Sequence, residues 1–115
     1  MLLKQQIKSD LKSAMKARDR EQVTVLRVLL GEIDNAEAVD ASLAADHPKA
    51  IEALPVGKQF EVPRRLLTEA DIEAILQREL DERLAMLETY TRLGQTSAAQ
   101  ALQLEANVIA RYLTE

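Results

Sequence analysis

Residues Asp10–Glu37 read DLKSAMKARDREQVTVLRVLLGEIDNAE, and this stretch predicts the corner of a helical hairpin. The apolar periodicity of one helix stops near Ala17, and that of a second helix begins near Arg20. Asp19 can cap the second helix, because its carboxylate accepts amide hydrogens left unpaired at a helix start. Gln22 follows three residues later and can complete a capping box. The stretch therefore predicts two helices joined by a tight turn.

Apolar residues at helical spacing predict four helices, at about residues 2–17, 20–39, 68–93 and 96–114. The third helix has the clearest start signal, with Thr68 as its cap and Asp71 three residues later. Gly94 follows this helix at a position where glycine commonly ends one. We expect Ser97 and Gln100 to form the capping box of the fourth helix.

Short connections pair these helices into two hairpins, and each hairpin has one apolar face. Neither face can be buried alone, so the fold class expected is all-α, a four-helix bundle made of two helical hairpins. Three prolines and one glycine punctuate residues 40–66, which predicts a long, partly ordered loop between the second and third helices. With 115 residues and one core, we expect a single domain over residues 1–115.

Some positions inside the helices predict particular contacts. Gly31 costs its helix about 1 kcal/mol relative to alanine, which predicts that another helix passes close to it. Arg27 interrupts the apolar face of the same helix, and we expect it to pair with Asp34 at the edge of the core. In the third helix the apolar face runs through Met86 or Leu87 to Tyr90. The acids Glu79, Glu82, Glu88 and Glu105 are expected to face solvent or to pair with Arg78, Arg83 and Arg92.

The residue inventory gives no support for independent catalysis. The chain has no cysteine, which excludes disulfides, thiol chemistry and cysteine zinc sites. The single histidine, His47, has no second ligand at helical spacing, and no glycine-rich phosphate loop is present. We therefore expect no catalytic residue, no metal site and no cofactor. No segment resembles a signal peptide or is long enough to span a membrane, so we expect a cytoplasmic protein.

Charge is distributed unevenly along the chain. The net charge is −4, but residues 1–30 hold seven basic and three acidic side chains, a balance of +4 that leaves −8 for the remainder. Lysines four residues apart form a basic ridge on the first helix. The candidate nucleic-acid-binding residues are Lys4, Lys8, Lys12, Lys16, Arg18 and Arg20. The alternative is an ordinary solvated helix face. No aromatic residues accompany these cations to stack on bases.

Two sets of motifs resemble the YqeY family. The first set reads Asp10-Leu11-Lys12-x-Ala14-Met15-Lys16-x-x-Asp19, followed by Leu26-Arg27-x-Leu29-Leu30-x-x-Ile33-x-Asn35-Ala36-Glu37. The second set comprises Leu67-Thr68, Leu76-x-Arg78-Glu79, Arg83, Tyr90, Gly94, Glu105 and Tyr112-Leu113. The resemblance covers the chain apart from residues 40–66.

YqeY proteins are similar to the tail region of GatB, the tRNA-binding subunit of glutamine-dependent aspartyl/glutamyl-tRNA amidotransferase, a carbon–nitrogen ligase. The resemblance implies an all-helical fold in which a four-helix bundle precedes a smaller three-helix bundle. This chain ends at Tyr112-Leu113-Thr114-Glu115, so we expect it to match the first helical domain only.

The resemblance also implies a function. It implies a non-catalytic accessory module linked to tRNA-dependent amidotransfer, because the amidotransferase chemistry belongs to other domains and subunits. The expected partners are tRNA and an amidotransferase or another translation-related protein, with no membrane partner. The basic ridge is the surface expected to contact tRNA phosphates. The alternative is a protein–protein interaction module with no RNA affinity.

Overall fold

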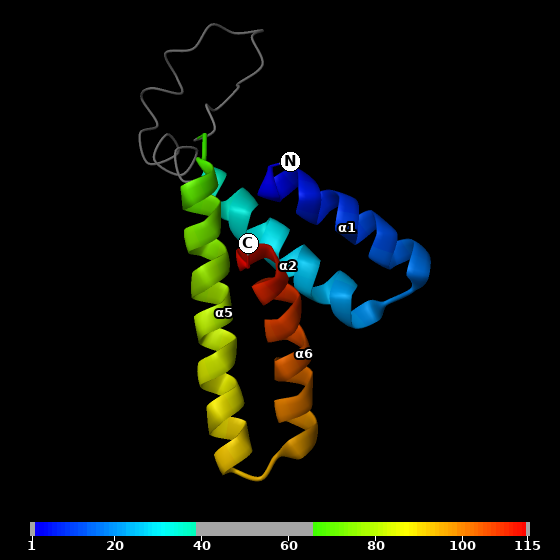
Figure 1. Ribbon diagram of the computed structural model, residues 1–115, viewed down its shortest axis with the longest axis vertical. Coiled ribbons are helices and arrows are strands. Elements are labelled where there is room, and N and C mark those ends of the chain that lie inside the picture. Colours follow the sequence, from blue (N-terminus) through cyan, green and yellow to red (C-terminus); the bar gives the residue numbers. More distant parts are fainter. Residues whose placement is uncertain (1, 39–65, 115) are drawn as a thin grey trace, which may run out of the picture.

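The computed structural model of the chain describes residues 2–38 and 66–114. These residues form four helices and no strand: α1 Leu3–Ala17, α2 Arg20–Glu37, α5 Glu69–Arg92 and α6 Thr96–Leu113 (Figure 1). The all-α fold is confirmed, and each helix boundary lies within two residues of its predicted position. The predicted loop 40–66 and His47 lie outside the described residues, apart from the exposed Leu66.

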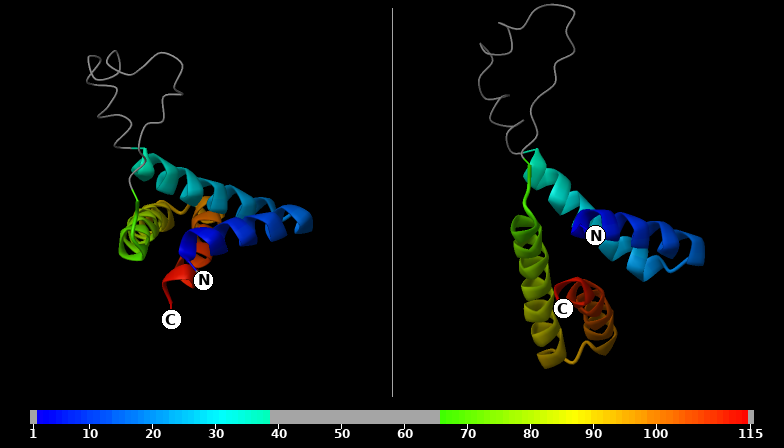
Figure 2. Two further views of the ribbon diagram at one scale, coloured as in Figure 1. Left: turned by 90° about the horizontal axis from the view of Figure 1, so that it is seen from above. Right: turned by 45° about the horizontal axis from the view of Figure 1, so that its top comes forward.

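The four helices form two antiparallel hairpins, α1–α2 and α5–α6, which cross obliquely. Figure 1 shows α2 running across the α5–α6 hairpin near one end, and Figure 2 shows α1 lying alongside α2. Helices α2 and α5 each contact the other three described helices, and α2 makes the most extensive contacts between the two hairpins, with both α5 and α6. The far ends of α5 and α6 extend beyond the first hairpin (Figure 1). The α2 helix is therefore the element on which the two hairpins are joined.

Helix starts and ends follow local signals in three of four places where the sequence predicts them. Asp19 Oδ1 accepts the Gln22 amide hydrogen at 3.2 Å, although the Gln22 side chain does not reciprocate. Thr68 and Asp71 form the full capping box, with N–O distances of 3.1 and 3.0 Å. At the end of α5, Gly94 has a φ of +73° and closes the turn, as expected for glycine.

The predicted cap of α6 is wrong. The Gly94 turn is completed within two residues, so α6 begins at Thr96 and Ser97 already lies in its first turn. Gln95 occupies the cap position and makes no side-chain capping bond. The short connection thus leaves no room for a Ser97 cap.

The core is aliphatic and is centred on α2, which contributes four buried side chains. The buried core cluster comprises Ile7, Ala14, Val25, Leu26, Leu29, Ile33, Ile72, Ile75, Leu76, Ile109 and Tyr112. Every described helix contributes to this cluster, so each hairpin covers the apolar face of the other. Burial of side chains of this kind stabilises a fold by about 1.5–3 kcal/mol each.

One expectation about a helix interior is wrong. A Cβ added to Gly31 would meet no atom within 4 Å, so none of the described helices passes close to it. In α5, Met86 is 46% exposed and Leu87 is partly buried, so Leu87 is the one of the two that belongs to the apolar face. Sequence periodicity gives the apolar face of a helix but not the length over which a neighbour covers it.

Two polar contacts tie α1 to helices much later in the sequence. The Tyr112 hydroxyl donates to Asp10 Oδ2 at 2.5 Å, which joins the last turn of α6 to α1. The Leu3 amide donates to Glu69 Oε2 at 3.1 Å, so a carboxylate of α5 satisfies an amide at the start of α1. This placement also suits the positive end of the α1 dipole. The first helix is therefore held at its start and in its middle by side chains from the second half of the chain.

We predict that Tyr112→Phe lowers the free energy of unfolding by about 1.5–3 kcal/mol at neutral pH, because Asp10 loses a hydrogen-bond donor. Burial and the bond to Asp10 also hold the pKa of the Tyr112 phenol well above its usual range. The phenol thus stays protonated in the folded chain while the unfolded chain ionises near pH 10, so wild-type stability falls as the pH rises above about 10.

Thermal unfolding, monitored by circular dichroism between pH 8 and 11, measures both the loss of stability in the variant and its dependence on pH. The stability of the Tyr112→Phe variant should fall less than that of wild type as the pH rises above about 10, because the variant has no phenol at this position. Tyr90→Phe is the matched control, since it removes the other tyrosine and leaves the Asp10 bond in place. Identical pH profiles for wild type and Tyr112→Phe would contradict the prediction.

Candidate nucleic-acid interface

The corner between α1 and α2 brings two of the predicted cations together. Arg18 takes the left-handed conformation, with a φ of +59°, in the position where a helix usually ends on glycine. Its amide donates to Met15 O at 3.2 Å, and the Asp19 amide donates to Ala14 O at 3.0 Å. Left-handed geometry costs a residue with a Cβ about 1–2 kcal/mol. Helix α2 then starts at Arg20, only two residues after Arg18.

The basic ridge of α1 is divided into two parts. At one end of the ridge, Lys4 already has ion-pair partners. Its Nζ lies 2.5 Å from Glu37 Oε1 and 3.6 Å from Asp34 Oδ1. The other lysines of the ridge, Lys8, Lys12 and Lys16, are exposed and form no ion pair within the described residues. The cationic surface available to a ligand therefore begins at Lys8 and runs toward the corner.

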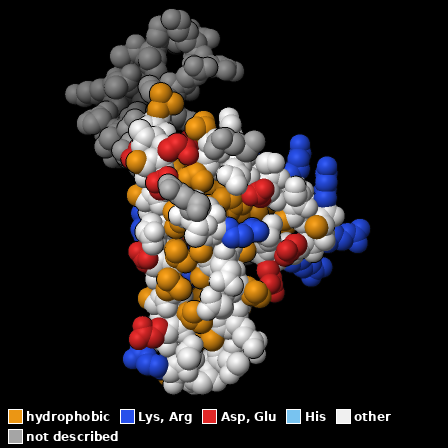
Figure 3. Space-filling model, viewed as in Figure 1, with side chains coloured by type: hydrophobic (Ala, Val, Ile, Leu, Met, Phe, Trp, Pro, Cys, Tyr) orange, Lys and Arg blue, Asp and Glu red, His pale blue; other side chains and the backbone are white. Residues whose placement is uncertain are grey.

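Arg27 extends this surface, contrary to its expected pairing with Asp34. It is exposed and forms no ion pair within residues 2–38 and 66–114, while Asp34 faces Lys4. Arg27 and Arg20 are seven residues apart, so they share one side of α2, and that spacing could have revealed the pair. Figure 3 shows Lys and Arg side chains gathered at the outer end of the α1–α2 hairpin.

An open hollow of about 810 Å³ lies at this corner. It is lined by Met15, Arg18, Arg20, Val23, Thr24 and Arg27. We call it the arginine hollow. No acidic side chain lines it, in contrast to a smaller hollow of about 300 Å³ between α2 and α6, where Asp19, Glu21 and Glu105 contribute to the lining. The arginine hollow is therefore the more suitable of the two for an anion.

A family model described as Yqey-like protein matches residues 4–115. The chain belongs to the YqeY family. No curated protein and no solved structure gives a significant match to it.

The structure gives physical roles to several motif residues of this YqeY-family chain. The first motif begins at Asp10 and the second set ends at Tyr112-Leu113, and the bond between Asp10 and Tyr112 joins them. Asp19 caps α2. Thr68 caps α5. These four residues therefore have structural roles that do not depend on any ligand.

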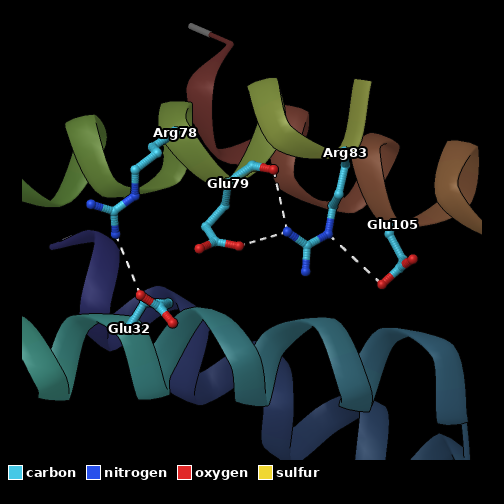
Figure 4. A network of polar contacts seen from close by, with 5 residues as sticks. All are labelled: Glu32, Arg78, Glu79, Arg83 and Glu105. Atoms are coloured by element: carbon cyan, nitrogen blue, oxygen red, sulfur yellow. Dashed lines mark hydrogen bonds and ion pairs between the residues drawn. The ribbon is translucent and has the colours of Figure 1, made fainter. Parts of the chain in front are cut away.

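Three further motif residues of the YqeY chain form a buried polar cluster between the hairpins (Figure 4). Arg83 Nη1 donates to Glu79 Oε2 at 2.6 Å and to the Glu79 carbonyl oxygen at 3.2 Å. Arg83 Nε is buried and lies 3.7 Å from Glu105 Oε1, outside hydrogen-bonding distance. The Arg78 side chain, by contrast, reaches across to Glu32 of α2 at the surface. The expected pairing of Glu79 and Glu105 with an arginine is confirmed.

The cluster links α5 to α6 within the second hairpin, and both charged ends of its strongest pair are about nine-tenths buried, so it has a structural role. In the described part of the YqeY chain, no three His, Cys, Asp or Glu side chains lie close enough to hold a metal ion. Among the same residues, no helix combines the length and apolar character needed to cross a membrane.

Proposed function

We propose that this YqeY-family chain is a non-catalytic accessory module linked to tRNA-dependent amidotransfer in the cytoplasm, where it contacts tRNA phosphates. One observation carries the proposal: the α1–α2 hairpin presents five predicted cations that are exposed and unpaired within the described residues. They are Lys8, Lys12, Lys16, Arg18 and Arg20. The similarity of YqeY proteins to the tRNA-binding subunit GatB supports the same partner.

The arrangement suits phosphate contacts in particular. Side chains four residues apart on one helix recur about every 6 Å along its axis, so the lysines present a row of positive charge. Unpaired exposed cations bind phosphates and release condensed counterions, which gives affinity without reading a base sequence. Lys4 is outside this surface, because Glu37 and Asp34 already neutralise it.

The test is the binding of labelled bulk tRNA across a salt series, with binding measured by fluorescence anisotropy. For wild type, the logarithm of the association constant should fall linearly with the logarithm of salt concentration. The K8Q/K12Q/K16Q variant should bind more weakly, and its salt slope should be smaller by about 2, because each phosphate contact contributes roughly 0.7–0.9. Helicity should be unchanged, since all three side chains are exposed.

The matched control is R78Q/R92Q/R111Q, which removes the same charge from exposed positions on α5 and α6. This variant should bind tRNA like wild type. Absence of tRNA binding by wild type even at low salt would overturn the proposal, and so would equal losses in the two variants. The second result would mean that net charge, rather than this surface, governs binding.

The second candidate is a protein–protein interaction module with no RNA affinity. It is favoured by exposed apolar side chains on α5 and α6: Leu84, Met86, Leu93 and Leu104. Such contacts are insensitive to salt, whereas phosphate contacts are not. Size-exclusion chromatography with light scattering at low and high salt separates the candidates. A complex that persists at high salt, from a chain that binds no tRNA, would favour this one.

A further inference from the structure

Lysine and arginine are segregated on the α1–α2 hairpin. The unpaired cations on the ridge of α1 are all lysines, whereas the cations lining the corner hollow are all arginines: Arg18, Arg20 and Arg27. Attraction to phosphate alone would be served by either residue. Guanidinium groups differ from ammonium groups in being planar, in stacking on flat rings and in holding phosphate oxygens with two parallel hydrogen bonds. The segregation therefore suggests different tasks for the ridge and for the corner.

Met15 and Val23 give the lining between the arginines an apolar part. Met15 is about half exposed there, and Val23 is partly buried. The Thr24 hydroxyl donates to Arg20 O at 2.9 Å, so its hydrogen is already used. A flat ring gains from contact with such a surface, whereas a carboxylate or a phosphate does not. The arginine hollow thus combines a surface for a ring with charges for the phosphates beside it.

Size and spacing agree with this combination. The hollow is open to solvent, and its volume of about 810 Å³ leaves room for a nucleotide to lie across it. Arg20 and Arg27 are separated by two helical turns, about 10 Å along the axis of α2, with Val23 and Thr24 between them. A nucleotide lying over Val23 would therefore have a guanidinium on either side. In a duplex the base faces are stacked and inaccessible, whereas unpaired bases can stack on arginine planes.

We infer that the arginine hollow binds an unpaired nucleotide of the RNA whose phosphates contact the α1 lysines, an inference that rests on the proposed function. The base lies on Met15 and Val23 and stacks against a guanidinium, and the flanking phosphates accept hydrogen bonds from the arginines. Guanidinium planes thereby serve in place of aromatic rings, which the lining of the hollow does not contain. The hollow selects single-stranded over duplex RNA, while the lysines bind both.

The test is the R18K/R20K/R27K variant of the full chain, which keeps every charge and removes every guanidinium of the hollow. Two labelled probes are titrated by anisotropy: a single-stranded RNA 12-mer without self-complementarity and a 12-base-pair RNA duplex. Wild type should prefer the single strand. The variant should bind the single strand roughly tenfold more weakly, which corresponds to the stacking free energy of one base. Its affinity for the duplex should be almost unchanged. Its salt slopes should equal those of wild type.

The matched control is R78K/R92K/R111K, which makes the same arginine-to-lysine exchange at three exposed positions on α5 and α6 and should keep the single-strand preference. If wild type has no preference, or if the arginine-to-lysine exchange in the hollow leaves it unchanged, the inference fails and the proposed function stands. If wild type binds neither probe, both fail. If a labelled poly-L-glutamate binds as tightly as the single strand and loses the same tenfold in the variant, the hollow is a site for acidic protein segments and the inference is overturned.

Discussion

Replacing Arg83 with alanine is expected to lower the free energy of unfolding by about 3–5 kcal/mol. The Glu79 side chain is only 8% exposed, and Arg83 Nη1 holds its carboxylate at 2.6 Å. Removal of the guanidinium leaves that carboxylate buried without its cation, and it also removes the nearest positive charge to Glu105. The loss is large because few water molecules can reach Glu79 to replace the arginine.

Urea unfolding followed by circular dichroism at 222 nm measures this loss. The informative companion is the double variant E79M/R83M, which fills the same space with apolar side chains. A buried ion pair exchanged for hydrophobic residues is often neutral in stability, so the double variant should be far closer to wild type than Arg83→Ala. A cost below about 1 kcal/mol for Arg83→Ala would mean that the cluster is open to solvent.

The second large effect is expected for Leu29→Ala, at about 2–5 kcal/mol. Leu29 is fully buried on α2, the helix that joins the two hairpins. A cavity at this position removes contacts between hairpins as well as within one, and the surrounding helices can collapse into it only partly. The same urea experiment measures the effect.

Leu104→Ala is the matched control for this prediction. It makes the same chemical change on α6, at a side chain that is 46% exposed, and should cost less than 1 kcal/mol. Equal costs at the two positions would contradict the view that α2 is the central helix of the core.

Local signals in the sequence account for the helices and most of their ends. Asp19 and Thr68 are capping residues whose effect depends on neighbours within three positions, so their roles could be predicted without a structure. The apolar faces of the helices could be predicted in the same way, because periodicity is a property of one helix. The two-hairpin architecture follows from these faces and from the short connections.

Contacts between helices could not be predicted, because they depend on how the helices pack in three dimensions. The Arg27–Asp34 pairing was reasonable on one helix, yet α1 packs against α2 with Lys4 beside Asp34, and Arg27 is left exposed. A Cβ added to Gly31 would likewise meet no atom within 4 Å. The sequence therefore proposed Arg18 and Arg20, which line the hollow, but it did not show that Lys4 is ion-paired or that Arg27 lies beside them.

The bond between Asp10 and Tyr112 has a consequence for synthesis on the ribosome. Its two residues are separated by 102 positions, so at about 5–20 residues per second the first helix waits roughly 5–20 s for its partner. During that interval α2 is completed, while the α5 and α6 side chains that pack against it are still to be translated. The α1–α2 hairpin is therefore made before the rest of the fold can cover its apolar face.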